Sequence, residues 1–496
     1  MKLLKIHTIL FLLTALIVLN SCSSASNNSA QSASDSKPTP DSVQTETLGA
    51  ASETDAADEA AVTGEGTAPP PEAWMNDFTG LEILDDEGNE IARCSDSKEA
   101  QDKLNHFQQA LIKQVNADLQ TELRIGEAEA EDIIFNRHTR IFSTMNQNMQ
   151  KIMDRVIMDA AYYPEELDPD LQTAMVIIDY HTGQVKAMSG GRDCDNTEIN
   201  RATDIIRQPG SSFQILAAYA PAMDMGLIDT DSIVVDEPFT IDGWQPLNWW
   251  GNSYKGEMTV RQAVAHSANV IAVKTGVDAG IDKCFDYVQK FHFTTIVDSK
   301  TIDGTTYTDR NAAMMLGGLT YGVRLLELTS AYSAIANDGD YISPSFYTRV
   351  CNNDGKVLLL ANPLSQQVLK KETANGLTDL MCGVVSEQTG TGRKAAFNEL
   401  NIPVAGKTGS TTYDQDLSFI GYTPYYAAGI WSGYDEITEE ETMSEMLEKG
   451  VMSSVRPILT VHQYYILDIW RDVMEEIHKE QNLREKSFPF PITRIP

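Results

Sequence analysis

Beyond about residue 80, hydrophobic residues recur along the chain at the spacings that strands and helices produce. The segment GLEILDDEGNEIAR (80–93) has two apolar runs around a glycine-containing turn, which predicts a β-hairpin. Residues 97–124 have the spacing of a charged helix. The segment TAMVIIDYHTGQVKAMSGG (173–191) predicts a strand, a tight turn and a second strand.

The rest of the pattern alternates between helices and strands. It predicts helices over 211–226, 259–279, 323–337 and 466–481, and adjacent β-strands over 402–410 and 417–435. A few strands with helices gathered between them indicate a mixed α/β (α+β) domain that carries an all-helical insert.

Residues 1–21 are typical of an export signal. Two lysines precede the apolar run ILFLLTALIVL (9–19), which is too short to cross a bilayer, since a spanning helix needs about 20 residues. The run leads into LNSC, which resembles a bacterial lipobox and predicts that Cys22 is the lipidated first residue of the mature protein. We therefore expect an extracytoplasmic lipoprotein anchored to the cell membrane. The alternative is that residues 9–19 act as a short membrane anchor.

Composition separates a tether from the folded body. Residues 22–73 are rich in Ser, Ala, Thr, Asp and Glu and contain no aromatic residue. Such a stretch cannot bury enough apolar surface to fold. We expect a disordered acidic tether that spans roughly 40 Å on average. Residues 74–138 are assigned to a small N-terminal α/β region, and residues 139–496 to the main domain.

Charge and cysteine content argue against two kinds of site. The net charge of −33 argues against nucleic acid, because phosphates repel such a chain. The five cysteines after Cys22 have neither CxxC nor Cys-His spacing, so we expect no metal and no cofactor. Because five is an odd number, at least one thiol is unpaired or pairs between chains. These cysteines are Cys94, Cys194, Cys284, Cys351 and Cys382.

The stretch RQPGSSFQIL (207–216) holds the first candidate for chemistry. Acyl transfer by a serine needs a hydroxyl at a helix start, a base, donors for the oxyanion and a cation for an anionic substrate. Ser211 follows a Pro-Gly turn and opens a predicted helix, whose free N–H groups favour negative charge. Gln214 shares its face one turn later, but an amide does not titrate as a lysine would. On this stretch alone, an ordinary capped helix start is the simpler interpretation.

Two further motifs follow. HSANV (266–270) supplies Ser267 and Asn269, a weak signal by itself. Lys-Thr-Gly occurs twice. Lys274 lies in a predicted helical continuation, and we expect it to be a surface lysine near a helix end. Lys407 and Thr408 follow IPVA on a predicted strand, where they can line the edge of a cleft, so we place the site at this second copy.

In this order, the three motifs resemble those of penicillin-binding proteins and serine β-lactamases. The surrounding segments resemble the transpeptidase domain of class A penicillin-binding proteins over about 139–496; they include IIDYHTGQVKAMSGGRD, INRATDIIRQPGSSF, YKGEMTVRQAVAHSANV, VSEQTGTG and SFIGYTPYYAAGIWSGYD. The resemblance implies a β-lactamase/transpeptidase-like fold with an antiparallel sheet flanked by helices. Bifunctional members also carry a glycosyltransferase domain, for which residues 74–138 are too few, so no glycan polymerisation is expected.

The resemblance also implies a role for each matching residue. Ser211 corresponds to the acylated serine, and its backbone N–H and that of Ser410 correspond to the oxyanion donors. Ser267 corresponds to the proton relay to the leaving amine. Asn269 corresponds to the residue that holds the substrate amide.

The third motif and the glutamine complete this implied site. Lys407 and Thr408, followed by Gly409, correspond to the substrate-binding strand that recognises a terminal carboxylate. Gln214 stands at the position of the general-base lysine. Since a positioned base contributes about 10²–10⁴ in rate, we expect slow acylation. Lys407 is the better substitute base, whereas we expect His266 to be a packed or surface histidine.

Three interpretations follow from the resemblance. The first is a weak DD-transpeptidase of peptidoglycan that uses a substitute base. The second is a pseudoenzyme that binds D-Ala-D-Ala stem peptides and β-lactams or serves as a scaffold for wall-synthesis proteins. The third is a soluble binding module that uses only the fold, and retention of Ser211, Ser267, Asn269 and the Lys-Thr-Gly strand weighs against it. Of the first two, impaired catalysis is favoured.

Overall fold

The computed structural model describes residues 79–163, 170–192, 199–302, 304–411, 414–435, 464–490 and 492. The predicted signal peptide, Cys22 and the predicted tether lie outside these ranges, as does Cys194. None of the helices in the described ranges combines the length and the hydropathy of a segment that crosses a bilayer. The four described cysteines are buried and form no disulfide.

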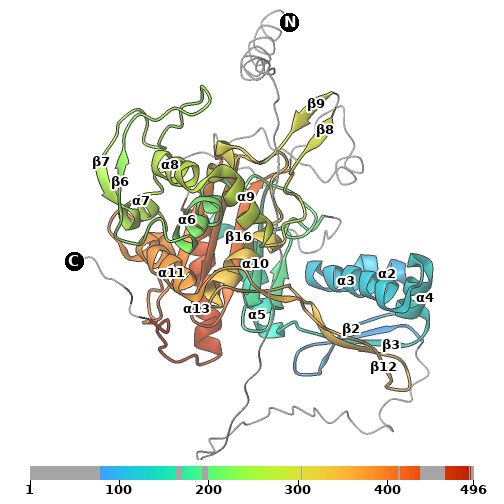
Figure 1. Ribbon diagram of the computed structural model, residues 1–496. Coiled ribbons are helices and arrows are strands. Elements are labelled where there is room, and N and C mark those ends of the chain that lie inside the picture. The colour runs from blue at the N-terminus through green and yellow to red at the C-terminus, as the bar shows by residue number, and fades with distance from the viewer. Residues whose placement is uncertain are drawn as a thin grey trace, which may run out of the picture. The chain divides into compact units, whose positions relative to one another are not determined.

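A five-stranded antiparallel sheet forms the centre of the main domain, with the strand order β14-β15-β16-β4-β5 (Figure 1). Its strands are β4 (Leu171–Asp179), β5 (Gln184–Ser189), β14 (Ala405–Ser410), β15 (Asp416–Tyr422) and β16 (Ala427–Tyr434). The predicted strand, turn and strand over 173–191 and the adjacent strands near the C-terminus are confirmed. β14, which carries the second Lys-Thr-Gly, lies at an edge of this sheet.

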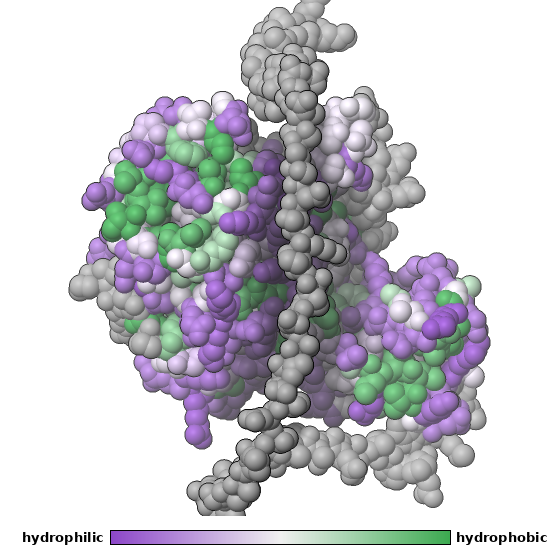
Figure 2. Space-filling model, viewed as in Figure 1, coloured by the Kyte–Doolittle hydropathy of each residue, from purple (hydrophilic) through white to green (hydrophobic). Residues whose placement is uncertain are grey.

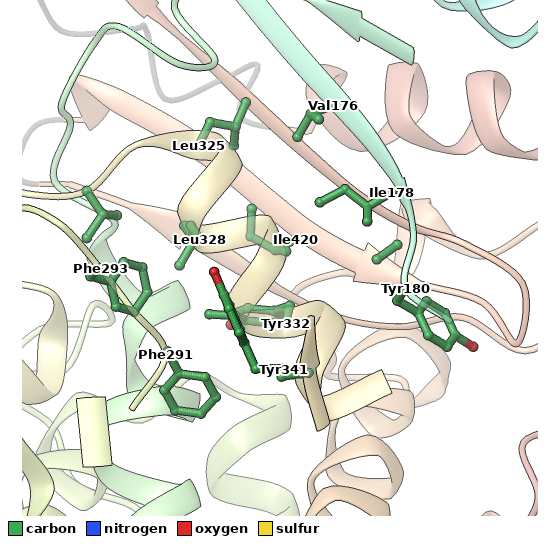
Figure 3. Packing of buried hydrophobic residues seen from close by; sticks show 14 of the residues in the cluster. Val176, Ile178, Tyr180, Phe291, Phe293, Leu325, Leu328, Tyr332, Tyr341 and Ile420 are labelled. Carbon is green, nitrogen blue, oxygen red and sulfur yellow. The ribbon is translucent and has the colours of Figure 1, made fainter. Parts of the chain in front are cut away.

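Helices cover both faces of the central sheet. They are α10 (Leu325–Ala336) and α11 (Lys371–Ser386) on one side, and α5 (Gln147–Met158) and α13 (Tyr465–Glu480) on the other. Val176 and Ile178 of β4 pack in the core that contains Tyr332 of α10 (Figure 3). Met175 and Ile177 point into the second core. Because both faces are covered, β4 is a continuous apolar run and does not alternate with polar residues.

A second five-stranded sheet is built from two distant parts of the chain, in the order β12-β11-β3-β1-β2. Its strands are β1 (Leu81–Leu84), β2 (Glu90–Cys94), β3 (Thr139–Ser143), β11 (Tyr347–Cys351) and β12 (Val357–Leu360). β1 and β2 form the predicted hairpin. The sheet therefore joins the N-terminal region to strands of the main domain. Figure 2 shows hydrophobic surface near β12, where the Leu360 residue is 71% exposed.

Three helices accompany this second sheet: α2 (Ser97–Lys103), α3 (His106–Leu123) and α4 (Glu127–Asn136). The helix predicted over 97–124 is thus interrupted before α3. The reason is local, since the Asn105 side chain accepts a hydrogen bond from the Gln108 N–H and the Gln108 side chain accepts one from the Asn105 N–H. Such a capping box starts a new helix.

The insert between β5 and α10 is not purely helical. Its helices are η3 (Gly210–Phe213), η4 (Ile215–Tyr219), α6 (Ala220–Asp224), α7 (Val260–Ala265), α8 (Asn269–Ala279), α9 (Ile281–Gln289) and η5 (Ala312–Leu316). Two hairpins interrupt them, β6 (Ile233–Asp236) with β7 (Gly256–Thr259) and β8 (Lys300–Ile302) with β9 (Thr305–Tyr307). The segment KTIDGTTY carries the Asp-Gly signal of a tight hairpin between β-branched residues.

Four short elements complete the described structure. β10 (Asp340–Ile342) pairs with β13 (Ser365–Gln367) in a two-stranded sheet. The single turns are η2 (Ala160–Tyr162) and η6 (Arg393–Ala395).

Candidate active site

The helix predicted over 211–226 is irregular where it carries Ser211. It begins as the 3-10 turn η3, continues as the π-helical η4 and becomes α-helical only in α6. Gly210 has a φ of 56°, and a Cβ built on it would lie 2.3 Å from the Ser410 carbonyl oxygen. Glycine adopts this left-handed conformation at little cost, and its lack of a Cβ is what allows the close approach. The Pro-Gly turn thereby brings Ser211 against the end of β14.

Ser267 occupies a second irregular position, the break between α7 and α8. Its φ of 54° is left-handed, which is uncommon for a residue with a side chain. Backbone hydrogen bonds hold the break, with Ser267 N–H donating to the Val264 carbonyl at 3.1 Å and Ala268 N–H to the Ala263 carbonyl at 2.9 Å. The helix predicted over 259–279 is therefore two helices, and the break turns Ser267 toward β14. Strained backbone held in this way is frequent at functional sites.

Lys407 is fully buried on β14 and contacts this serine. Its Nζ lies 2.8 Å from Ser267 Oγ and 3.1 Å from the Thr408 carbonyl oxygen. Burial lowers the pKa of Lys407 from 10.5 to about 7, because a charged amine loses hydration there. A substantial part of the Lys407 side chains is therefore neutral near pH 7 and able to accept a proton.

Gln214 is also fully buried and is bound to Asn269. Its Nε2 donates to Asn269 Oδ1 at 2.9 Å, while Asn269 Nδ2 donates to the Leu247 carbonyl at 3.0 Å. Among the described residues, Gln214 Oε1 has no hydrogen-bond partner, and no hydrogen bond joins Gln214 to Ser211. The glutamine thus occupies the pocket under the serine with a group that cannot take its proton.

These residues meet at one cleft with a volume of about 730 Å³. Six of the predicted site residues line it: Ser211, Ser267, Asn269, Thr408, Gly409 and Ser410. Lys407 and Gln214 lie buried beneath its wall, in contact with Ser267 and Asn269 respectively. The structure therefore brings together every predicted site residue that it describes, and Cys22 lies outside the described ranges.

The sequence analysis missed several lining residues. Trp244 and Trp249 line the cleft from the loop between β6 and β7, Thr391 from the loop after α11, and Tyr464 from the start of α13. Trp249 is 65% exposed, and its indole N–H donates to the His266 carbonyl at 2.8 Å. The sequence does contain a signal for this loop, since two adjacent tryptophans lie in the polar segment LNWWGNS.

Two neighbouring residues have other partners. His266 is half-buried, and its Nδ1 lies 3.0 Å from Lys255 Nζ. Burial and the Lys255 charge lower the pKa of His266. Lys274 is not the surface residue we predicted, because its side chain is only 15% exposed. It donates to the Val235 carbonyl at 2.9 Å and to Glu237 at 2.8 Å, so it ties α8 to β6 and does not line the cleft.

Known proteins are similar to this chain in sequence. A family model described as penicillin binding protein transpeptidase domain matches residues 173–449, more than half of the chain. Penicillin-binding protein 1A of Clostridium perfringens is 31% identical over 430 residues, which cover 82% of this chain and 48% of that protein. Penicillin-binding protein 4 of Bacillus subtilis is 34% identical over 272 residues, which cover 55% of this chain and 41% of that protein. The chain spans about half the length of these curated relatives.

Solved structures have a similar fold. The penicillin-binding protein PonA1 of Mycobacterium tuberculosis superposes with a TM-score of 0.61 at 25% identity, over 78% of this chain and 95% of that one. Its complex with penicillin V gives a TM-score of 0.63 at 24% identity, over 79% and 97% of the two chains. The mixed α/β transpeptidase fold is thereby confirmed. This chain belongs to the family of penicillin-binding protein transpeptidase domains.

Proposed function

We propose that this protein binds β-lactams and the D-Ala-D-Ala stem peptides of peptidoglycan, and that it acylates Ser211 only slowly. One observation carries the proposal. The cleft contains Ser211, Ser267 and Asn269, with the Lys407 amine in contact with Ser267, whereas the neutral amide of Gln214 stands where the resemblance implies a general base. The relative PonA1 has been solved with penicillin V, which supports a β-lactam as ligand.

The remaining proton path runs through Lys407. Ser211 Oγ attacks the carbonyl carbon of the peptide or lactam bond, and its proton passes by way of Ser267 to neutral Lys407. The C–N bond then breaks, and Lys407 returns the proton by way of Ser267 to the departing amine, which leaves an ester on Ser211. Lys407 must be neutral for this step but charged to attract a terminal carboxylate. The two requirements conflict, which is one reason to expect slow turnover.

A second candidate function is non-catalytic binding. It is favoured by the hydrogen bond between Gln214 and Asn269, which holds Asn269 in the cleft without a base. In this case the protein recognises stem peptides or acts as a scaffold for wall-synthesis proteins. The two candidates differ in whether Ser211 forms a covalent product.

The test is labelling with a fluorescent penicillin, followed by mass spectrometry of the intact protein. We expect an adduct at Ser211 that accumulates over minutes to hours and is absent from Ser211→Ala, because the nucleophile is present and its base is not. An adduct on Ser211→Ala would contradict the assignment of the nucleophile. Complete binding without any adduct would favour the scaffold.

We further propose that Cys22 carries the lipid that anchors the protein outside the cytoplasmic membrane. Cys22→Ala is expected to release most of the protein from the membrane fraction, because the run at 9–19 is shorter than a bilayer-spanning helix. Fractionation followed by immunoblotting measures this. Ser23→Ala is the matched control and should stay membrane-bound. Full membrane retention of Cys22→Ala at unchanged size would instead identify residues 9–19 as the anchor.

A further inference from the structure

Thr391 lies in the cleft on a loop that links three parts of the site. It follows α11 in the segment VSEQTGTG. On either side of it, Gly390 N–H donates to the Glu387 carbonyl at 3.0 Å and Gly392 N–H to the Val384 carbonyl at 3.0 Å. Thr391 N–H donates to the Ala265 carbonyl, at the end of α7, at 3.2 Å. The backbone of Thr391 is therefore fixed against both α11 and the helix that leads to Ser267.

The Thr391 hydroxyl meets the substrate-binding strand. Its Oγ1 lies 2.8 Å from Thr408 Oγ1, and both residues line the cleft beside Ser211 and Ser410. Each hydroxyl has a single proton to donate. When one hydroxyl donates to the other, the proton of the second can point toward a ligand. A carboxylate accepts several hydrogen bonds, so it can take a proton from either hydroxyl or from both.

The charge of the nearby Lys407 amine can attract a carboxylate, but hydrogen bonds to the carboxylate are left largely to these hydroxyls. Lys407 Nζ is buried and is already in contact with Ser267 Oγ and the Thr408 carbonyl. Among the described residues that line the cleft, none is a lysine, an arginine or a histidine. A ligand carboxylate at β14 therefore needs neutral donors, and the two threonines provide them.

We propose that Thr391 is a specificity-determining residue of this cleft, which together with Thr408 binds the terminal carboxylate of the ligand through paired hydroxyl groups. The proposal rests on the proposed function, because it assumes that a β-lactam or a stem peptide enters the cleft. It assigns to the loop after α11 a direct contact with ligand. A merely structural Thr391 would join the loop to β14 and leave the ligand untouched.

Two ligands that differ only in the carboxylate separate these roles. We would titrate wild type, Thr391→Val and Thr391→Ser with benzylpenicillin and with its methyl ester. Occupancy is followed by tryptophan fluorescence, since Trp244 and Trp249 line the cleft. Thr391→Val keeps the shape of the side chain and removes its proton. It should raise the half-saturating concentration of benzylpenicillin about tenfold, as loss of a hydrogen bond to a charged group does.

The methyl ester and the Thr391→Ser variant distinguish a ligand contact from a structural role. The methyl ester should bind Thr391→Val within about twofold of wild type, and Thr391→Ser should restore binding of benzylpenicillin. Equal weakening of acid and ester in Thr391→Val would overturn the inference, because it indicates a structural role. Unchanged binding of both would overturn it as well. If wild type binds the ester as tightly as the acid, the inference about Thr391 is wrong but the proposed function stands. If wild type binds neither ligand, the inference and the proposed function are both rejected.

Discussion

Gln214→Lys is expected to raise the rate of Ser211 acylation by benzylpenicillin by a factor of about 10² or more. The new amine would replace an amide that is fully buried beside Asn269 Oδ1. Burial and the neighbouring Lys407 both lower the pKa of such a lysine, so a neutral base becomes available to Ser211. The measurement is the time course of the covalent adduct by mass spectrometry, with Ser211→Ala as the blank.

Gln214→Met is the matched control for this gain. It fills the same buried space without a nitrogen, so it should acylate no faster than wild type. Rapid acylation of wild type would mean that another group already serves as an efficient base. If Gln214→Lys brings no gain, other parts of the site have decayed and the scaffold function is favoured.

Lys407→Met is expected to lower the acylation rate at pH 8 by about 10² or more, if Lys407 is the remaining base. In wild type the rate should rise with pH and level off above about 7, because the pKa of Lys407 is lowered to about 7 and only the neutral amine accepts a proton. This pH dependence can be measured from initial rates of adduct formation between about pH 5.5 and 9, a range that brackets the pKa. A pH-independent wild-type rate would contradict the role.

The same pKa has a consequence for stability. Between about pH 7 and 10.5 the unfolded chain carries a proton on Lys407 that the folded protein lacks. The free energy of unfolding should therefore decrease as pH falls from 10.5 to about 7, and this contribution is constant below 7. Lys407→Met should remove that dependence.

Lys274→Ala, outside the cleft, is the control for the acylation experiment and should leave the acylation rate unchanged.

The sequence predicted most of the local structure and the members of the site. Apolar runs on either side of turn residues predicted the β1–β2 hairpin and the two strands around 180–183, since each depends on neighbouring residues. The motif order predicted that Ser211, Ser267 and Lys407 meet. The residues allow Gln214 to bind either Ser211 or Asn269. The choice of Asn269 was not predictable, because the contact joins side chains 55 residues apart whose rotamers depend on the fold.

The missed features share a physical cause. Thr391 and Trp249 lie on loops, where no periodicity indicates which side chain points into a cleft. The surface placement of Lys274 was wrong, because a helical pattern does not show that a carbonyl of β6 lies within reach of the amine. The second sheet was only half predicted, because β11 pairs with β3 across a long stretch of chain and β12 joins the sheet only through β11.

That second sheet has a consequence for how the protein is made. Thr348, on β11, donates to the carbonyl of Phe142, on β3, and 206 residues separate the two. At about 5–20 residues per second, a ribosome needs roughly 10–40 s to synthesise that interval. During this delay one edge of β3 has no strand to pair with, and an open strand edge is a template for association with other chains. We therefore expect β3 to be open to association with other chains until β11 becomes available, whether at the ribosome or after export, and the order of the strands determines how long that takes.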